Sequence, residues 1–107
     1  MPLIDHTSVT PVEMLPGIFR RTMTDGDEMM LCEVTLDGGA IVPMHTHPHE
    51  QTGYLVSGRL RLKIDDEVRD LSPGDCWMIP GGVPHEATAL ERAVIIDVFS
   101  PPREEYR

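Results

Sequence analysis

Positive charge is scarce in this sequence: nine Lys and Arg residues stand against eighteen Asp and Glu residues, which gives a formal net charge of -9. Nucleic-acid-binding proteins need a basic face for the phosphate backbone, so this balance argues against that class and equally against anionic membranes. Long apolar runs are also absent, and no segment predicts a transmembrane span or a secretion signal. We therefore expect a cytoplasmic protein that acts on a small molecule.

Cysteine is just as scarce. Cys32 and Cys76 lie far apart and form no CxxC pair, which predicts two reduced thiols. The 107 residues are enough for one domain, 1–107, in which 1–14 form an N-terminal arm or edge segment and 101–107 a polar tail that can pack back over it. A chain this short has a modest core, so we expect a homodimer.

Helical periodicity is missing from every window, and the chain divides into short strand-like runs separated by Gly, Pro and Asp turns. The run 60–64 alternates strictly, which directs Leu60, Leu62 and Ile64 to a core. Residues 65–66 then predict a hairpin turn. The apolar run 93–99 suits a strand buried on both sides. Many short strands with regular turns predict an all-β sandwich or closed β-barrel.

The strongest chemical signal is a group of histidines. In an extended chain His45 and His47 project to the same side, and His85 follows a Gly/Pro-rich loop that can bring it alongside. Gln51 can add a carbonyl oxygen. Three nitrogens and one oxygen suit one divalent ion of Ni, Zn, Fe, Mn or Cu, without deciding between them. The alternative is a set of surface or hydrogen-bonded histidines.

A single charge, Asp97, interrupts the apolar run 93–99. Burial of an unpaired carboxylate is costly or raises its pKa, so Asp97 either faces a cavity or is paired. In a cavity beside a metal it can act as a general acid or base. The alternative is a structural carboxylate bonded to Arg103 or Arg92. Arg103 itself follows two prolines and can clamp a substrate carboxylate.

Two spaced motifs resemble those of the cupin superfamily. The first consists of Gly39, five residues, His45-x-His47, three residues, Gln51, six residues and Gly58; the second of Gly74, five residues, Pro80-x-Gly82, two residues and His85. The resemblance implies a cupin (jelly-roll, RmlC-like) β-barrel. Two positions depart from the usual pattern, because Gln51 replaces a glutamate and Ala89 an asparagine. Glu50 is an alternative ligand one residue out of register, and His49 is expected at the rim or beside a ligand, without binding the metal itself.

Two stretches, 45–54 and 97–106, look like the pectin-degradation protein KdgF family. That resemblance implies a metal site of His45, His47, Gln51 and His85. It also implies Asp97 as the catalytic acid/base, with Phe99 and Arg103 contacting the sugar. The implied reaction opens 4,5-unsaturated uronates, from pectin or alginate, into the linear keto form. The rival hypotheses are a cupin dioxygenase, another isomerase or lyase of small-molecule metabolism, and a non-catalytic binding protein.

Overall fold

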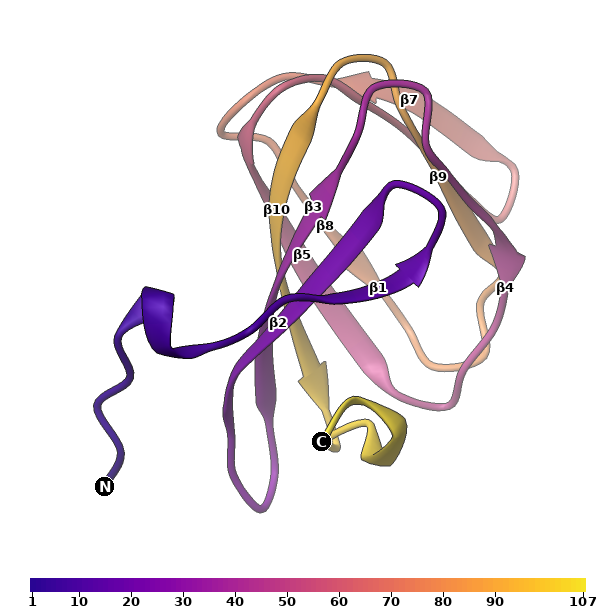
Figure 1. Cartoon of the computed structure of the whole chain (residues 1–107). Coiled ribbons are helices and arrows are strands. Elements are labelled where there is room, and N and C mark those ends of the chain that lie inside the picture. The colour runs from indigo at the N-terminus through magenta and orange to yellow at the C-terminus, as the bar shows by residue number, and fades with distance from the viewer.

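The computed structural model describes residues 1–107, and nearly all of its regular secondary structure consists of short strands (Figure 1). The elements, in chain order, are η1 (His6–Ser8), β1 (Val12–Leu15), β2 (Ile18–Asp25), β3 (Met30–Leu36), β4 (Ile41–His45), β5 (Glu50–Ser57), β6 (Leu60–Ile64), β7 (Glu67–Leu71), β8 (Cys76–Ile79), β9 (His85–Ala89), β10 (Ala93–Ser100) and η2 (Glu104–Tyr106). No helix has the length and apolar character needed to cross a membrane.

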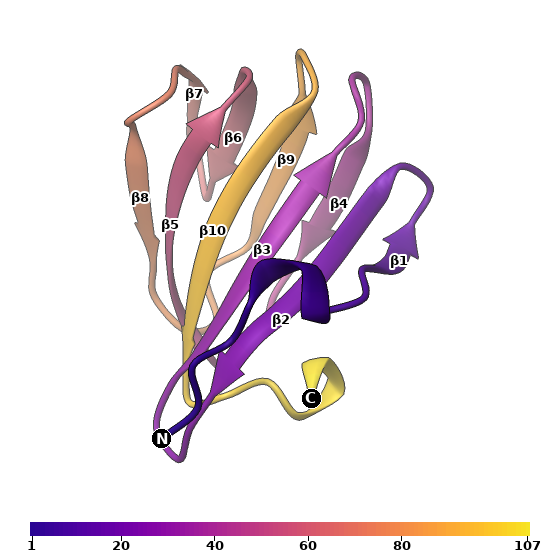
Figure 2. The same cartoon turned by 60° about the vertical axis from the view of Figure 1, so that its left-hand side comes forward.

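The strands form two antiparallel sheets that face each other (Figures 1 and 2). The larger sheet has the order β1-β2-β3-β10-β5-β8, and the smaller has the order β4-β9-β6-β7. Because sequence neighbours such as β3 and β4 lie in different sheets, the chain crosses repeatedly between the two layers. This confirms the predicted all-β class and the jelly-roll arrangement of its strands.

Local sequence patterns account for most of the strands. The predicted hairpin is present: β6 pairs with β7, and Asp65 takes a positive φ of 52° in the turn between them. Leu60 and Leu62 are buried and Ile64 is half-buried, as the alternation predicts. Twelve buried residues fill the space between the sheets. They are Ile18, Val34, Leu36, Leu55, Leu60, Leu62, Leu71, Trp77, Ile79, Ala89, Ala93 and Ile95.

The expectation that 93–99 is buried on both sides is wrong. Strand β10 is central in its sheet, but burial alternates along it. Ala93, Ile95, Asp97 and Phe99 are buried between the sheets, whereas the intervening residues are only half-buried. The outer face of the sheet carries no second layer over β10, so apolar residues there remain partly exposed.

The expected homodimer stays a prediction from chain length.

The segment 6–9 near the N-terminus and the C-terminal tail both lie against β2 and β3, whereas the first residues project away from the sheet (Figures 1 and 2). At the N-terminus, Arg21 donates a hydrogen bond to the carbonyl of Val9 at 2.9 Å, and His6 Nε2 lies 2.8 Å from Glu33 Oε1. At the C-terminus, Thr22 donates to the carbonyl of Tyr106 at 2.6 Å. The polar tail 101–107 therefore folds back over the domain, beside a small second cluster of Met30, Cys32 and Phe99.

Candidate metal centre and its pocket

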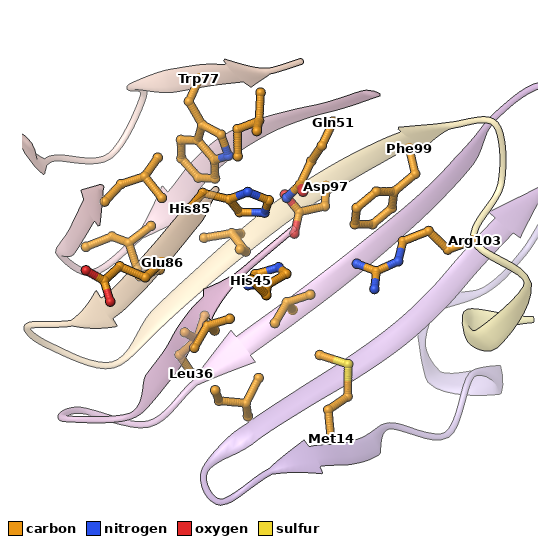
Figure 3. A pocket seen from close by; sticks show the side chains of 18 of the residues that line it. Met14, Leu36, His45, Gln51, Trp77, His85, Glu86, Asp97, Phe99 and Arg103 are labelled. Carbon is orange, nitrogen blue, oxygen red and sulfur yellow. The ribbon is translucent and has the colours of Figure 1, made fainter. Parts of the chain in front are cut away.

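His45 and His85 meet because their strands pair. His45 is the last residue of β4, His85 is the first of β9, and the two are direct partners in the antiparallel register. Partners in such a pair project to the same face. The ring centroids lie 4.2 Å apart, and both side chains point into the pocket (Figure 3).

His47 reaches the same point from outside regular structure. Alternation in the sequence predicts that His47 shares an extended strand with His45, but β4 ends at His45 and His47 lies in the connection to β5. The glycine-rich loop that precedes β9 holds it there: the Gly82 N–H donates to the carbonyl of His47 at 2.9 Å. A Cβ added at Gly81 would lie 2.3 Å from the carbonyl oxygen of Pro48, so only glycine allows this approach.

The three histidines form one compact cluster. One ligand nitrogen from each of His45, His47 and His85 lies within 4.8 Å of the other two. His47 and His85 are buried, whereas His45 is half-buried at the more open side. The cluster predicted from the spacing of the motifs is therefore present. Glu50, the alternative ligand, is an exposed side chain outside the cluster.

Backbone carbonyls fix the tautomer of each ring. The Nδ1 atoms of His45, His47 and His85 lie 2.9, 3.0 and 2.9 Å from the carbonyl oxygens of Pro43, His49 and Val83. A carbonyl oxygen only accepts, so each Nδ1 carries the proton and donates it. In the neutral rings the Nε2 lone pairs are then free for a metal. His49, expected at the rim or beside a ligand, supplies one of these carbonyls and is itself half-buried.

Burial favours the neutral form of two of these rings, His85 and His47. Burial lowers the pKa of His85 to about 4, against the hydrogen bond to the carbonyl of Val83; repulsion from Arg103, and from His45 and His47 when these are protonated, lowers it further. Burial is also the main reason that the pKa of His47 is lowered, followed by the charge of Arg103. Neutral imidazole is the form that binds metal. His47 and His85 are thus ready to bind a cation near neutral pH.

Two features of the polar atoms test whether a metal fits. The Nε2 atom of His85 is buried and has no hydrogen-bond partner. The Nε2 atom of His47 lies 3.0 Å from Oε1 of Gln51, although both atoms are acceptors in the tautomers described. Neighbouring ligands of one ion with bonds of about 2.1 Å lie about 3.0–3.4 Å apart, so a shared cation accounts for both observations. A divalent transition metal fits these four side chains.

Gln51 connects the histidines to Asp97. Its Nε2 donates a hydrogen bond of 2.9 Å to Asp97 Oδ1, which turns Oε1 towards His47. Gln51 is paired with Phe99 across β5 and β10, and Asp97 lies two residues before Phe99 on the same face. The bond therefore runs diagonally between adjacent strands. The alternative in which Asp97 is bonded to Arg103 or Arg92 is wrong, because no arginine forms an ion pair with it.

The second carboxylate oxygen of Asp97 has no hydrogen-bond partner in the protein. The residue is only 5% exposed, and burial raises its pKa to about 6, against the lowering effects of the Gln51 hydrogen bond and the charge of Arg103. Asp97 lines the same pocket as His45, His85 and Gln51 (Figure 3). A carboxylate with a pKa near neutrality and one free oxygen can take up and return a proton.

Phe99 and Arg103 line the same pocket beside Asp97 (Figure 3). Arg103 Cζ lies 5.1 Å from the centroid of the Phe99 ring, and the ring of His47 meets Phe99 edge-on at 5.8 Å. The side chain of Arg103 is 12% exposed, with Glu105 as its ion-pair partner at 2.9 Å. All seven side chains singled out in the sequence thus gather in one place.

Two aromatic residues that no sequence motif points to, Trp77 and Tyr106, also line the pocket. Trp77 lies over Gly53: a Cβ on Gly53 would be 2.1 Å from the indole. Gly53 is paired with Trp77 on one side and with Asp97 on the other. A tryptophan paired with a glycine indicates a pocket wall only when the register of the two strands is known. Neither strand's sequence alone predicts that register.

Comparisons with known proteins agree with this site. Residues 32–99 match the cupin domain family. The chain is 37% identical, over 91% of its length and 91% of the relative, to the pectin degradation protein KdgF of Dickeya dadantii. It is 32% identical to oxalate decarboxylase OxdC of Bacillus subtilis over 66% of its length, but covers only 20% of that protein.

Solved structures give the same result. KdgF from Halomonas sp. superimposes with a TM-score of 0.95 at 33% identity, covering 100% of this chain and 99% of that one. An RmlC-like cupin from Shewanella frigidimarina gives 0.93 at 28% identity, with 96% and 93% covered. The protein therefore belongs to the cupin family, with a three-histidine site of the kind that holds a divalent metal and with KdgF among its relatives.

Proposed function

We propose that this cupin is a metal-dependent enzyme that opens the ring of 4,5-unsaturated uronates and converts them to the linear keto form. The observation that carries the proposal is the environment of Asp97. This buried carboxylate has one oxygen bonded to Gln51 and one free, in a pocket that also contains Phe99 and Arg103. The likeness to KdgF supports pectin-derived substrates in particular.

The reaction needs two proton transfers and no other reactant. Asp97 takes the proton of the anomeric hydroxyl, so that C1 becomes a carbonyl and its bond to the ring oxygen breaks. The electron pair of that bond leaves the ring oxygen as an enolate conjugated to the C4–C5 double bond. Asp97 then returns the proton to C4, which makes C5 a ketone. A single carboxylate with a pKa near neutrality is suited to both steps.

The other side chains bind and orient the sugar. Arg103 holds the uronate carboxylate with its guanidinium fork, and Phe99 packs against the ring. Gln51 fixes the orientation of Asp97 through its amide N–H. A divalent ion on His45, His47, His85 and Gln51 would supply positive charge that polarises the substrate oxygens.

The rival hypotheses predict different behaviour. A cupin dioxygenase consumes oxygen, whereas uronate opening consumes none. A non-catalytic binding protein has no use for a free buried carboxylate beside the histidines, because such a group costs folding free energy. The partial likeness to oxalate decarboxylase keeps a decarboxylase or lyase as the second candidate.

The test is a spectroscopic assay with the metal-loaded protein. We expect it to accelerate the loss of the near-ultraviolet absorbance of a 4,5-unsaturated galacturonate, with no oxygen uptake. Asp97→Asn should lower kcat at least about 1,000-fold while the bound metal per chain is unchanged. The matched control is Asp66→Asn in the exposed β6–β7 turn, which should have normal activity. Normal turnover by Asp97→Asn would remove Asp97 from the mechanism.

A further inference from the structure

The C-terminal tail is attached to strand β2 and the turn that follows it. Besides the bond from Thr22 to the carbonyl of Tyr106, Arg107 forms an ion pair with Asp25 at 3.2 Å and donates to the carbonyl of Gly26 at 3.1 Å. Figure 3 shows Arg103 entering the pocket from this side. The place of Arg103 therefore depends on how the tail is held.

Two arginines share the ring of Tyr106. The guanidinium carbon of Arg20 lies 4.3 Å from the ring centroid, and that of Arg103 lies 4.1 Å from it. Phe99 meets the same ring edge-on, with centroids 5.7 Å apart. Tyr106 thus contacts both residues that we propose to bind the sugar, and Arg20 contacts Tyr106 from β2.

Arg20 has no carboxylate partner. Its Nε donates to Thr22 Oγ1 at 3.1 Å, and no Asp or Glu oxygen lies within ion-pair distance. It is half-buried on β2 opposite the buried Val34, in a position where an apolar side chain would be expected. Its principal partner is therefore the face of Tyr106, and a cation over an aromatic face is a favourable contact when partly desolvated.

We propose that Arg20 is a positioning residue, which holds the Tyr106 ring and through it the guanidinium of Arg103. This inference rests on the proposed role of Arg103 as the uronate clamp. Arg103 has a second restraint, the ion pair with Glu105, but the Glu105 side chain is 55% exposed. The aromatic contacts with Tyr106 and Phe99 keep the guanidinium over the pocket when the substrate carboxylate replaces Glu105.

The first measurement needs no activity. The ¹⁵N–¹H signal of the Arg103 Nε–H group, assigned by its loss in Arg103→Gln, should be resolved from free arginine by its hydrogen bond and by the two rings. Arg20→Gln and Tyr106→Leu should both shift it towards the free-arginine region, because the contribution of the Tyr106 ring is changed or lost while the bond to Glu105 can persist. Tyr106→Phe keeps the ring and the main-chain bond from Thr22, so the signal should stay in place.

The second measurement is kinetic. In Arg20→Gln and Tyr106→Leu we expect KM for the unsaturated uronate to rise about tenfold with kcat changed less than about twofold. The reason is that Arg103 is held less firmly for binding the substrate carboxylate, whereas the position of Asp97 is unchanged. Arg69→Gln removes the same charge from an exposed position in the middle of β7, where Arg69 pairs with Glu67, and should leave KM unchanged. This control separates positioning from a general loss of positive charge.

The outcomes distinguish this inference from the proposed function. If the wild type does not convert uronates, the proposed function is wrong. The Arg103 signal still tests whether Arg20 positions Arg103. If the signal stays in place in both Arg20→Gln and Tyr106→Leu, the positioning role is wrong whatever the activity. Since Arg20 is on β2 and Tyr106 is in the tail, a folding defect in one variant leaves the other as the test.

Discussion

The amide N–H of Gln51 donates a 2.9 Å hydrogen bond to the carboxylate of Asp97. The opposite end of the same amide faces His47 at 3.0 Å. One neutral side chain therefore links the metal cluster to the proposed acid/base. A glutamate, the usual residue at this motif position, has no N–H to donate.

The first prediction concerns this link. Gln51→Glu should retain the metal, because the added negative charge favours a cation, but kcat should fall at least about 100-fold. The physical reason is that two carboxylates at hydrogen-bond distance share a proton, which Asp97 can then no longer exchange freely. Metal analysis and kcat measure the two effects. The double variant Gln51→Glu/Asp97→Asn serves as the control: it restores the hydrogen bond and stability, yet should remain inactive.

The second prediction is that Asp97 reduces the stability of the metal-free protein. Its pKa rises from 3.8 to about 6 on folding, so between these values the folded state binds more protons than the unfolded state. The free energy of unfolding should therefore fall as pH rises through this window, and the deficit is complete above it. Asp97→Asn should remove the deficit and stabilise the protein at pH 7 by up to about 3 kcal/mol.

Urea unfolding at pH 4, 5, 6 and 7 measures this difference between the wild type and Asp97→Asn. The gap between the two proteins should widen from pH 4 to pH 7. Asp66→Asn, on the exposed turn, should follow the wild-type profile. A gap that is constant with pH would mean that Asp97 does not titrate in this range.

The third prediction concerns acid release of the metal. Protons compete with metal for the imidazole nitrogens. Because burial lowers the pKa of His85 to about 4, its neutral form persists well below the pKa of ordinary histidine. We expect full metal occupancy after dialysis at pH 6 and release only as pH falls towards about 4. Elemental analysis of the dialysed protein measures this, with His6→Ala as a control outside the site. Loss of half the metal at pH 6 would contradict it.

The fourth prediction uses the only tryptophan. Gly53→Ala places a Cβ about where the Trp77 indole lies, so the ring must move or the strands must separate. We expect a loss of about 2 kcal/mol of stability and a red-shifted Trp77 emission as the indole becomes solvated. Gly26→Ala is the matched control, because a Cβ added at Gly26 would lie 3.8 Å from its nearest neighbour, the carbonyl oxygen of Met29. Unchanged emission in Gly53→Ala would show that the wall of the pocket tolerates the methyl group.

Much of the fold is readable from the sequence because its determinants are local. The alternation from Leu60 to Ile64 and the turn at Asp65 depend on residues that are neighbours in the chain, and the structure confirms both. The spacing of the histidines in the two motifs also predicts their meeting. The burial of β10 cannot be predicted in this way. Its outer face is buried only if other elements pack over it, and no local pattern shows whether they do.

Only the tertiary structure shows which side chains and backbone groups the individual site residues contact. The apolar run around Asp97 shows that its charge needs a partner, but the choice of Gln51 over Arg92 or Arg103 follows from the pairing of β5 with β10. His47 is held by the loop before β9, although sequence alternation placed it on a strand with His45.

Alternation, the positions of glycine and proline, and residue type indicate many of the strands and turns and the set of side chains available for chemistry, because these depend on neighbours in the chain. The tertiary structure decided which of those side chains touch. Arg20 and Tyr106 are 86 residues apart in the chain, and only the return of the tail onto β2 makes them neighbours. Contacts of this kind depend on strand register and chain reversal, which are properties of the whole fold and of no single segment.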